Sequence, residues 1–109
     1  MDVQHLFDSR GDWIAFRLGE HVFDPGGDWV GWLPWDDGEI VDAHGEYLGT
    51  IVDRDGSRLY RYRDREYRGY PGYRENPGYP GYPGHPDSAS RDYPPFGADD
   101  VDLLEIPVS

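Results

Sequence analysis

A ten-residue unit that occurs four times between residues 6 and 60 decides the fold. The copies are LFDSRGDWIA at 6–15, VFDPGGDWVG at 22–31, IVDAHGEYLG at 40–49 and IVDRDGSRLY at 51–60. Each begins with two apolar residues and Asp, reaches Gly at its sixth position and, in the first three copies, continues into an aromatic, an aliphatic and a small residue. Such a repeat indicates one supersecondary unit used several times.

Each unit predicts a β-hairpin with a tight turn. Asp at the first turn position and Gly at the fourth suit a type I turn, because Asp accepts hydrogen bonds from turn amides and Gly tolerates positive φ. The flanking apolar and aromatic residues favour strands. The expected turn pairs are Asp8 with Gly11, Asp24 with Gly27, Asp42 with Gly45, and Asp53 with Gly56. We expect positive φ at all of these glycines.

A small residue recurs in the outgoing strand of the first three units, two residues after an aromatic one. The pairs are Trp13 and Ala15, Trp29 and Gly31, and Tyr47 and Gly49. Strand alternation predicts that each pair shares a face, and a recurring small residue indicates close approach of strands around an axis. We therefore expect an all-β fold of roughly eight short strands, in which four consecutive hairpins close into a propeller- or barrel-like pseudo-four-fold arrangement. A flat eight-stranded meander is the alternative, but it would leave its edges exposed.

Three of these stretches resemble a known family. LFDSRGDWIAF, VFDPGGDWVGWL and IVDAHGEYLGTIVDRDG are similar to the bacterial four-fold beta flower proteins, small domains of four hairpin-like petals. The resemblance covers roughly residues 3–63 and implies a fold, but no activity and no catalytic residues. The fourth unit departs from the pattern, with Arg58 in the aromatic place and Tyr60 in the small place. A shorter stretch, EIVDAHGEYLGTIVD, resembles one strand pair of a PRC-type barrel, a fold used for partner docking.

The composition changes near residue 68, after which Tyr, Pro and Gly dominate. We expect a four-hairpin module at 1–67, a low-complexity tail at 68–98 and an acidic, apolar terminal peptide at 99–109. Pro and Gly favour an extended or turn-rich tail without a packed core, and the terminal peptide could dock on a partner or complete the module as an extra strand. The residues expected to bind a partner are Trp35, Tyr70, Tyr73, Tyr79, Tyr82, Leu103, Leu104 and Ile106.

Charge and cysteine usage exclude several classes of protein. The chain has 22 acidic residues against 10 Arg, a net charge of −12, and neither Lys nor Cys. Disulfides and cysteine-ligated metals are therefore excluded, and the charge repels nucleic acid over most of the surface. The sequence has no apolar run long enough for a transmembrane segment and no signal-like N-terminus, so we expect a cytoplasmic protein.

The sequence offers little for catalysis or metal binding. The four repeated Asp residues share one repeat position, which favours a turn role over the contrasting environments of a catalytic pair. Asp53 begins a stretch that lacks the further ligands of a calcium loop, and the four His, with no Cys to join them, lack the spacing of a zinc site. We expect no catalytic residue, no metal and no cofactor, and hence no enzyme.

Alternating Arg and Tyr at 58–63 form the one basic region. Such a run can bind single-stranded RNA through phosphate contacts and stacking. The interpretation favoured here is a last strand whose Tyr pack inward or across strands while its Arg pair with the acidic module.

These observations favour a non-catalytic protein-interaction or assembly module that docks a protein partner, or a second copy of itself, through its aromatic surface and its C-terminal tail. An accessory or scaffold subunit of a larger complex is one alternative. A small-ligand binder or hydrolase that uses the Trp-rich face is another.

Overall fold

A computed structural model describes residues 3–35, 37–53, 57–64, 68–72 and 74–101, and those residues form strands and no helix. The eight strands are β1 (Val3–Phe7), β2 (Trp13–Leu18), β3 (His21–Phe23), β4 (Trp29–Trp32), β5 (Glu39–Val41), β6 (Tyr47–Asp53), β7 (Ser57–Tyr62) and β8 (Ala98–Asp100). The expected all-β class is confirmed. No helix in the described part of the chain is long and apolar enough to cross a membrane.

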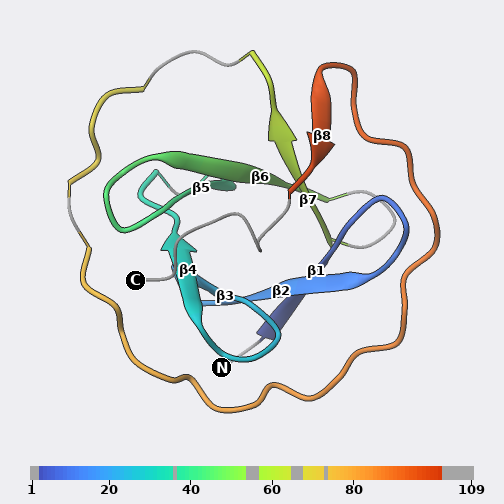
Figure 1. Ribbon diagram of the computed structural model, residues 1–109, viewed down its shortest axis with the longest axis horizontal. Coiled ribbons are helices and arrows are strands. Elements are labelled where there is room, and N and C mark those ends of the chain that lie inside the picture. The colour runs from blue at the N-terminus through green and yellow to red at the C-terminus, as the bar shows by residue number, and fades with distance from the viewer. Residues whose placement is uncertain (1–2, 36, 54–56, 65–67, 73, 102–109) are drawn as a thin grey trace.

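The sheet closes on itself. Neighbouring strands pair antiparallel in sequence order from β1 to β8, and β1 also pairs with β7, in parallel, at Phe7 and Arg58. This last pairing makes a seven-stranded barrel, to which β8 is added at β7 (Figure 1). The closed arrangement is therefore confirmed over the flat meander, because pairing of β1 with β7 removes the two free edges of the seven strands.

The module contributes seven strands because its third and fourth hairpins share β6. Gly45 and Gly56 are 11 residues apart, against 16 and 18 for the earlier pairs of turn glycines, and this leaves room for one strand between the turns. The eighth strand comes from the C-terminal part of the chain. Of the two roles left open for the terminal peptide, residues Ala98–Asp100 take the second, an extra strand added to the module.

A bulge recurs at the same place in the first three hairpins and changes which side chains share a face. The strand register shifts at Leu6/Phe7, Val22/Phe23 and Ile40/Val41. An extra residue in the outgoing strand interrupts the alternation of side chains. Trp13 accordingly packs with one hydrophobic cluster and Ala15 with the other. The expectation that Trp13 and Ala15 share a face was therefore wrong.

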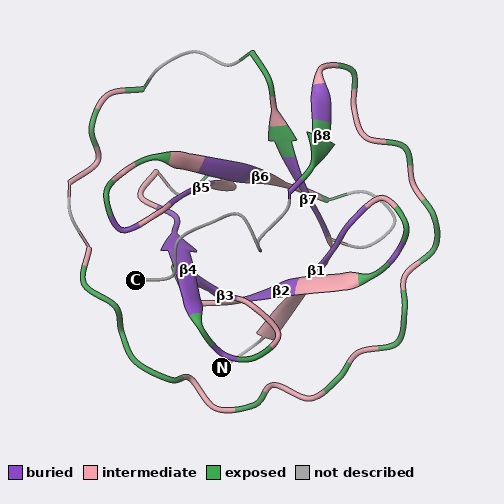
Figure 2. Cartoon of the chain, in the orientation of Figure 1, coloured by how far each residue is buried: buried purple, intermediate pink, exposed green. Residues whose placement is uncertain are grey.

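The two clusters divide the core. The inner cluster contains Leu6, Ala15, Val22, Val30, Leu33, Ile40, Leu48, Leu59 and Val101. It takes residues from every hairpin, as expected for the interior of a closed barrel, and each barrel strand contains buried residues (Figure 2). The aromatic cluster contains Phe16, Phe23, Trp29, Trp32, Val41 and Ala43. Its buried members come from the strands β2 to β5 and the loop after β5, and Val3 of β1 packs against them.

The burial expected for Ala15, Gly31 and Gly49 is confirmed. We expect Gly31→Val to destabilise the fold by about 1–3 kcal/mol through overpacking. A Cβ at Gly31 would overlap the backbone carbonyl oxygen of Val41, which is held within the sheet, whereas at Gly49 the nearest atom is a methyl carbon of Val101 at 2.9 Å. Urea denaturation should therefore show a larger loss for Gly31→Val than for Gly49→Val. Wild-type stability for both variants would contradict the close approach of strands.

The tail lies against the module and encircles it. We call residues 63–97 the belt, and its described parts, 63–64, 68–72 and 74–97, lie around the outside of the barrel (Figure 1). They return to where they began, because the Arg63 amide donates to the Gly97 carbonyl at 2.8 Å. The belt's described residues form neither helix nor strand, as the composition indicates. They nevertheless lie in contact with the module. They pack on the module rather than forming a core of their own, and β8 spans the boundary expected between residues 98 and 99.

Candidate binding surface

Three turns of the module share one hydrogen-bonded geometry. The Gly11, Gly27 and Gly45 amides donate to the carbonyls of Asp8, Asp24 and Asp42 at 3.0–3.1 Å. In each turn an Oδ1 atom of the Asp also accepts the amide four residues later, at 3.0 Å. The glycines have φ of 88°, 90° and 86°, which confirms the expected positive φ for these three. Gly56, the fourth, lies outside the described residues.

The belt lies directly on these three turns, in the reverse of their chain order. The Tyr70 ring covers Gly45, the Tyr79 ring covers Gly27, and the backbone at Ala89 covers Gly11. A Cβ at Gly45 would lie 2.9 Å from ring carbons of Tyr70, and at the other two glycines it would overlap the belt. Each turn glycine thus provides both a left-handed conformation and the space that the belt occupies.

Aromatic side chains of the module hold the belt between the turns. The Arg68 guanidinium lies 4.5 Å from the centre of the Trp35 ring, and that of Arg74 lies 5.0 Å from the Trp32 ring. Arg68 also forms ion pairs with Asp37 and Glu39. These contacts place cations over indole faces, the most favourable surface for them. Arg68 and Arg74 of the belt thus pair with acids and aromatic rings of the module.

Trp13 provides the next contact along the belt. The rings of Tyr82 and His85 approach it edge-on, with centroids at 6.5 and 5.0 Å. Edge-to-face packing at these distances is the geometry that aromatic pairs prefer. Trp13, Trp32 and Trp35 therefore contact the belt in the described structure, whereas Trp29 is buried in the aromatic cluster.

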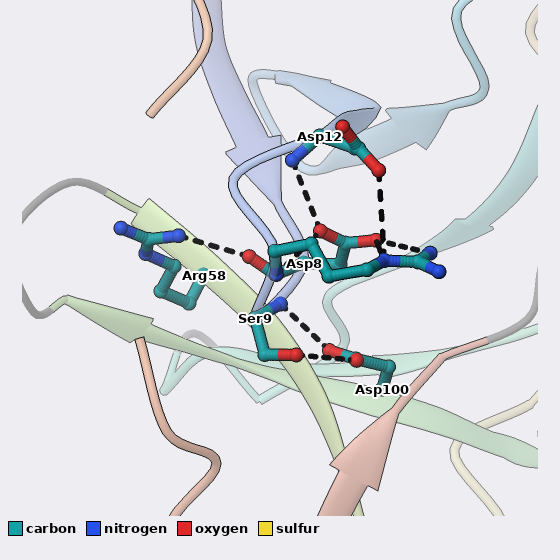
Figure 3. Close-up of polar contacts among 6 residues, drawn as sticks. Asp8, Ser9, Asp12, Arg58 and Asp100 are labelled. Carbon is teal, nitrogen blue, oxygen red and sulfur yellow. Dashed lines mark hydrogen bonds and ion pairs between the residues drawn. The ribbon is translucent and has the colours of Figure 1, made fainter. Parts of the chain in front are cut away.

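The last part of the belt is held by two buried side chains of β7. Arg58 and Tyr60 have no exposed surface. Arg58 donates from Nη1 to the Asp8 carbonyl at 2.9 Å, a contact drawn in Figure 3, and from Nη2 to the Ser90 carbonyl at 2.6 Å. The Tyr60 hydroxyl donates to Asp92 Oδ2 at 2.7 Å. We call Arg58, Tyr60, Ser90 and Asp92 the latch.

Backbone hydrogen bonds extend the latch. The Ala89 amide donates to the Gly11 carbonyl at 3.0 Å and the Asp92 amide to the Ser9 carbonyl at 2.8 Å. Ser9 in turn donates from its amide and hydroxyl to both carboxylate oxygens of Asp100, at 2.8 and 2.6 Å (Figure 3). The first turn is therefore joined both to the belt and to β8.

The latch explains why the fourth repeat departs from the other three. An aromatic residue in place of Arg58 would lack donors for the carbonyls of Asp8 and Ser90, and a small residue in place of Tyr60 could not reach Asp92. The basic run at 58–63 forms the expected strand as β7, with Tyr60 buried and Arg63 paired with Asp99 at 2.6 Å. Among its described partners, Arg58 donates to the backbone carbonyls of Asp8 and Ser90 and to the Ser90 hydroxyl.

Tyr60 gives the latch a predictable pH dependence. Burial raises the pKa of its hydroxyl above the usual value, and the hydrogen bond to Asp92 raises the pKa further. A raised pKa in the folded state means that the neutral hydroxyl stabilises the fold below about pH 10, and that this stabilisation is lost as the pH rises above the unfolded value. We expect Tyr60→Phe to lose about 1 kcal/mol near pH 7.

The measurement is urea denaturation of the wild type and Tyr60→Phe at neutral pH and above pH 10. The difference in stability between them should shrink at the higher pH. Tyr93→Phe is the control, because Tyr93 is 85 % exposed and its change should leave the stability unaltered. An unchanged difference at both pH values would contradict the Tyr60–Asp92 hydrogen bond.

Two cavities lie between the belt and the module. The larger, of about 400 Å³, has largely apolar walls that include Leu18, Phe23, Pro77, Tyr79 and Pro80. We call it the belt cavity. The smaller, of about 260 Å³, brings Trp35 and Tyr70 together with His44 and Arg61. Two of the residues expected to bind a partner therefore meet in one hollow.

The polar groups beside these cavities and in the turns have the following environments. His21 lines the belt cavity, and burial lowers its pKa, so the ring is neutral near pH 7. The carboxylates of Asp8, Asp24 and Asp42 accept turn amides, as described above. Within the described ranges no group of three or more His, Asp or Glu side chains could hold a metal ion. The site is thus suited to packing and hydrogen bonding with another molecule.

The exposed aromatic residues of the described chain gather on the belt. They are Tyr70, Tyr79, Tyr82, Tyr93 and Phe96, with exposed fractions of 62 % to 103 %. Trp35 is half-buried, and Tyr73, Leu103, Leu104 and Ile106 lie outside the described residues. Tyr93 and Phe96 were not predicted from the sequence, although two prolines between two aromatic residues could have indicated them. The latch was not predicted either, and its signal was the departure of the fourth repeat at Arg58 and Tyr60.

Comparison with known proteins identifies a family. The family model described as 4-fold beta flower protein matches residues 1–97, so the match extends over the belt. Searches of the curated proteins and of the solved structures found no match for the chain.

Proposed function

Because the chain belongs to the 4-fold beta flower family, a family described by its shape, we propose that it is a non-catalytic module that binds or assembles proteins through the aromatic surface of its belt. One observation carries this proposal: every large hydrophobic side chain that is exposed in the described chain lies on the belt. Exposed hydrophobic groups gathered in one region are typical of interaction sites.

The way in which the belt is held supports the same proposal. Tyr side chains offer a large contact area with few torsions to fix, which makes them common in protein interfaces. Here they are carried by a segment already fixed by the turns, Arg68, Arg74 and the latch. A surface that is ordered before binding loses less conformational entropy when the partner arrives.

The experiment replaces the two most exposed rings. We expect the double variant Tyr93→Ser and Phe96→Ser to lose partner binding while keeping its melting temperature, because these rings are 85 % and 103 % exposed. The readout is the stoichiometry of proteins, including the chain itself, that co-purify with the tagged chain from its native cells. The double variant Ser88→Ala and Asp87→Ala, also exposed on the belt, is the control. Equal capture by all three forms would contradict the proposal.

The belt cavity supports one second candidate, a binder of small apolar molecules. Its volume of about 400 Å³ lies within the range of ligand sites, and its walls are largely apolar. A metabolite screen by thermal shift would detect such a ligand through the stabilisation that binding produces.

An accessory subunit of a larger complex, at fixed stoichiometry, is a form of the first proposal. We propose the cytoplasm as the compartment, and fractionation of the native cells tests it.

A further inference from the structure

The most exposed large hydrophobic side chain of the described belt is held on a rigid loop. Phe96 follows Pro94 and Pro95, and proline fixes its own φ. The loop is anchored at one end by Asp92, which bonds to Tyr60 and Ser9. At the other end it leads into β8, and the Ala98 amide donates to the Pro95 carbonyl at 3.0 Å. Phe96 is thus held in solvent with little freedom left to lose on binding.

The same chain offers a cavity that suits such a ring. The belt cavity is lined by apolar side chains, among them Leu18, Phe23 and Tyr79. It is open on one side of the barrel, between the β2–β3 hairpin and residues 77–80 of the belt. A phenyl ring entering it would meet apolar walls on several sides, the setting in which interface residues contribute most to affinity.

The ring and the cavity of one molecule cannot meet each other. In Figure 1 the loop before β8 lies at the upper right edge, whereas the belt near residue 80 lies at the opposite edge, beyond β3. A contact between Phe96 and the belt cavity must therefore join two molecules. Because it uses two different surfaces, it is heterologous and repeats from one copy to the next.

The local charges permit this contact despite a net charge of −12. Residues 93–97 carry no charge. Beside them, Asp92 accepts a hydrogen bond from Tyr60, and Asp99 pairs with Arg63. Beside the cavity, Glu20 pairs with Arg74. The remaining repulsion is long-range and is screened by salt.

We infer that Phe96 of one copy inserts into the belt cavity of a second copy, so that the chains assemble head to tail. This inference rests on the proposed function and names its partner, a second copy of this chain. Salt should strengthen the assembly, because it screens the repulsion between acidic molecules while the contact itself is apolar.

The test is sedimentation of the full chain over a range of concentrations. We expect the wild type to form dimers and larger species, and Phe96→Ser to raise the dissociation constant by about 30-fold or more, as loss of a central interface anchor does. Pro77→Glu, at the exposed rim of the cavity, should weaken assembly in the same way. Ser88→Glu adds the same charge to the belt outside the cavity and should assemble like the wild type. Circular dichroism checks that each variant is folded.

A mixture of Phe96→Ser and Pro77→Glu decides the geometry. The first variant keeps the cavity and the second keeps the ring, so the mixture should form dimers and stop there. Wild type that stays monomeric through the millimolar range, or Phe96→Ser that assembles normally, overturns the inference. If the wild type is monomeric but binds another protein through Tyr93 and Phe96, the proposed function stands without this inference. If neither kind of binding depends on these rings, both fail.

Discussion

A chain that ends at Arg68 is expected to lose its cooperative unfolding transition. The truncation removes β8 from β7 and takes Val101 out of the inner cluster. It also leaves the buried side chains of Arg58 and Tyr60 without their partners at Ser90 and Asp92. A module of about sixty residues is marginal on its own, because it buries only about 60 % of the surface of its unfolded chain. The loss of this strand pairing, core packing and hydrogen bonding is expected to exceed the free energy of unfolding of such a small domain.

The measurement is thermal unfolding followed by near-ultraviolet circular dichroism, which reports on the packed Trp residues. The matched control ends at Val101 and keeps every contact described above, so it should melt like the full chain. A chain ending at Arg68 that melts cooperatively at the wild-type temperature would show that the belt and β8 contribute little to the fold. The belt could then act only as a docking segment.

Arg58→Ala is expected to cost about 3–5 kcal/mol, the second-largest effect. Arg58 is fully buried and donates to the Asp8 and Ser90 carbonyls at 2.9 and 2.6 Å. Its removal leaves those acceptors without this donor and opens a cavity beneath the belt, and each of these changes costs a few kcal/mol. Arg58→Lys keeps the charge but loses the planar fork that reaches both carbonyls, so it should recover only part of the loss.

Arg61→Ala is the control for Arg58→Ala, because Arg61 lies on the same strand and is exposed. An exposed substitution of this kind is expected to change stability by less than about 0.5 kcal/mol. Urea denaturation gives both values. Equal effects at positions 58 and 61 would mean that the latch does not hold the belt.

The repeat predicted the hairpins because its signals are local. Asp8 and Gly11 define a turn through their own backbone and side-chain preferences, and neighbouring apolar residues define the strands. Closure was also the favoured interpretation of the sequence, because a small residue that recurs at one position, such as Gly31, indicates close approach of strands and because closure removes exposed edges. The bulges could not be predicted from the sequence, because the register shift at Leu6/Phe7 depends on how two strands pair rather than on the residues of either strand.

The belt could not be predicted because its contacts are not periodic. A segment of Tyr, Pro and Gly lacks the apolar alternation that indicates packing, so its composition favours an extended chain. Its order comes from surfaces that the module forms only after folding: the bare glycines of three turns, the Trp rings and the latch. The departures at Arg58 and Tyr60 were visible in the sequence, but their partners at Ser90 and Asp92 are 32 residues away.

Amide hydrogen exchange at Ala89 and Asp92 tests most directly whether the belt is part of the fold. These amides donate to the Gly11 and Ser9 carbonyls at 3.0 and 2.8 Å. They exchange only when the belt opens. We expect protection of the same order as that of Leu59, within β7, and its loss in Arg58→Ala. Exchange of both amides at the rate of an unfolded chain, with the β7 amides still protected, would show that the belt is not part of the fold.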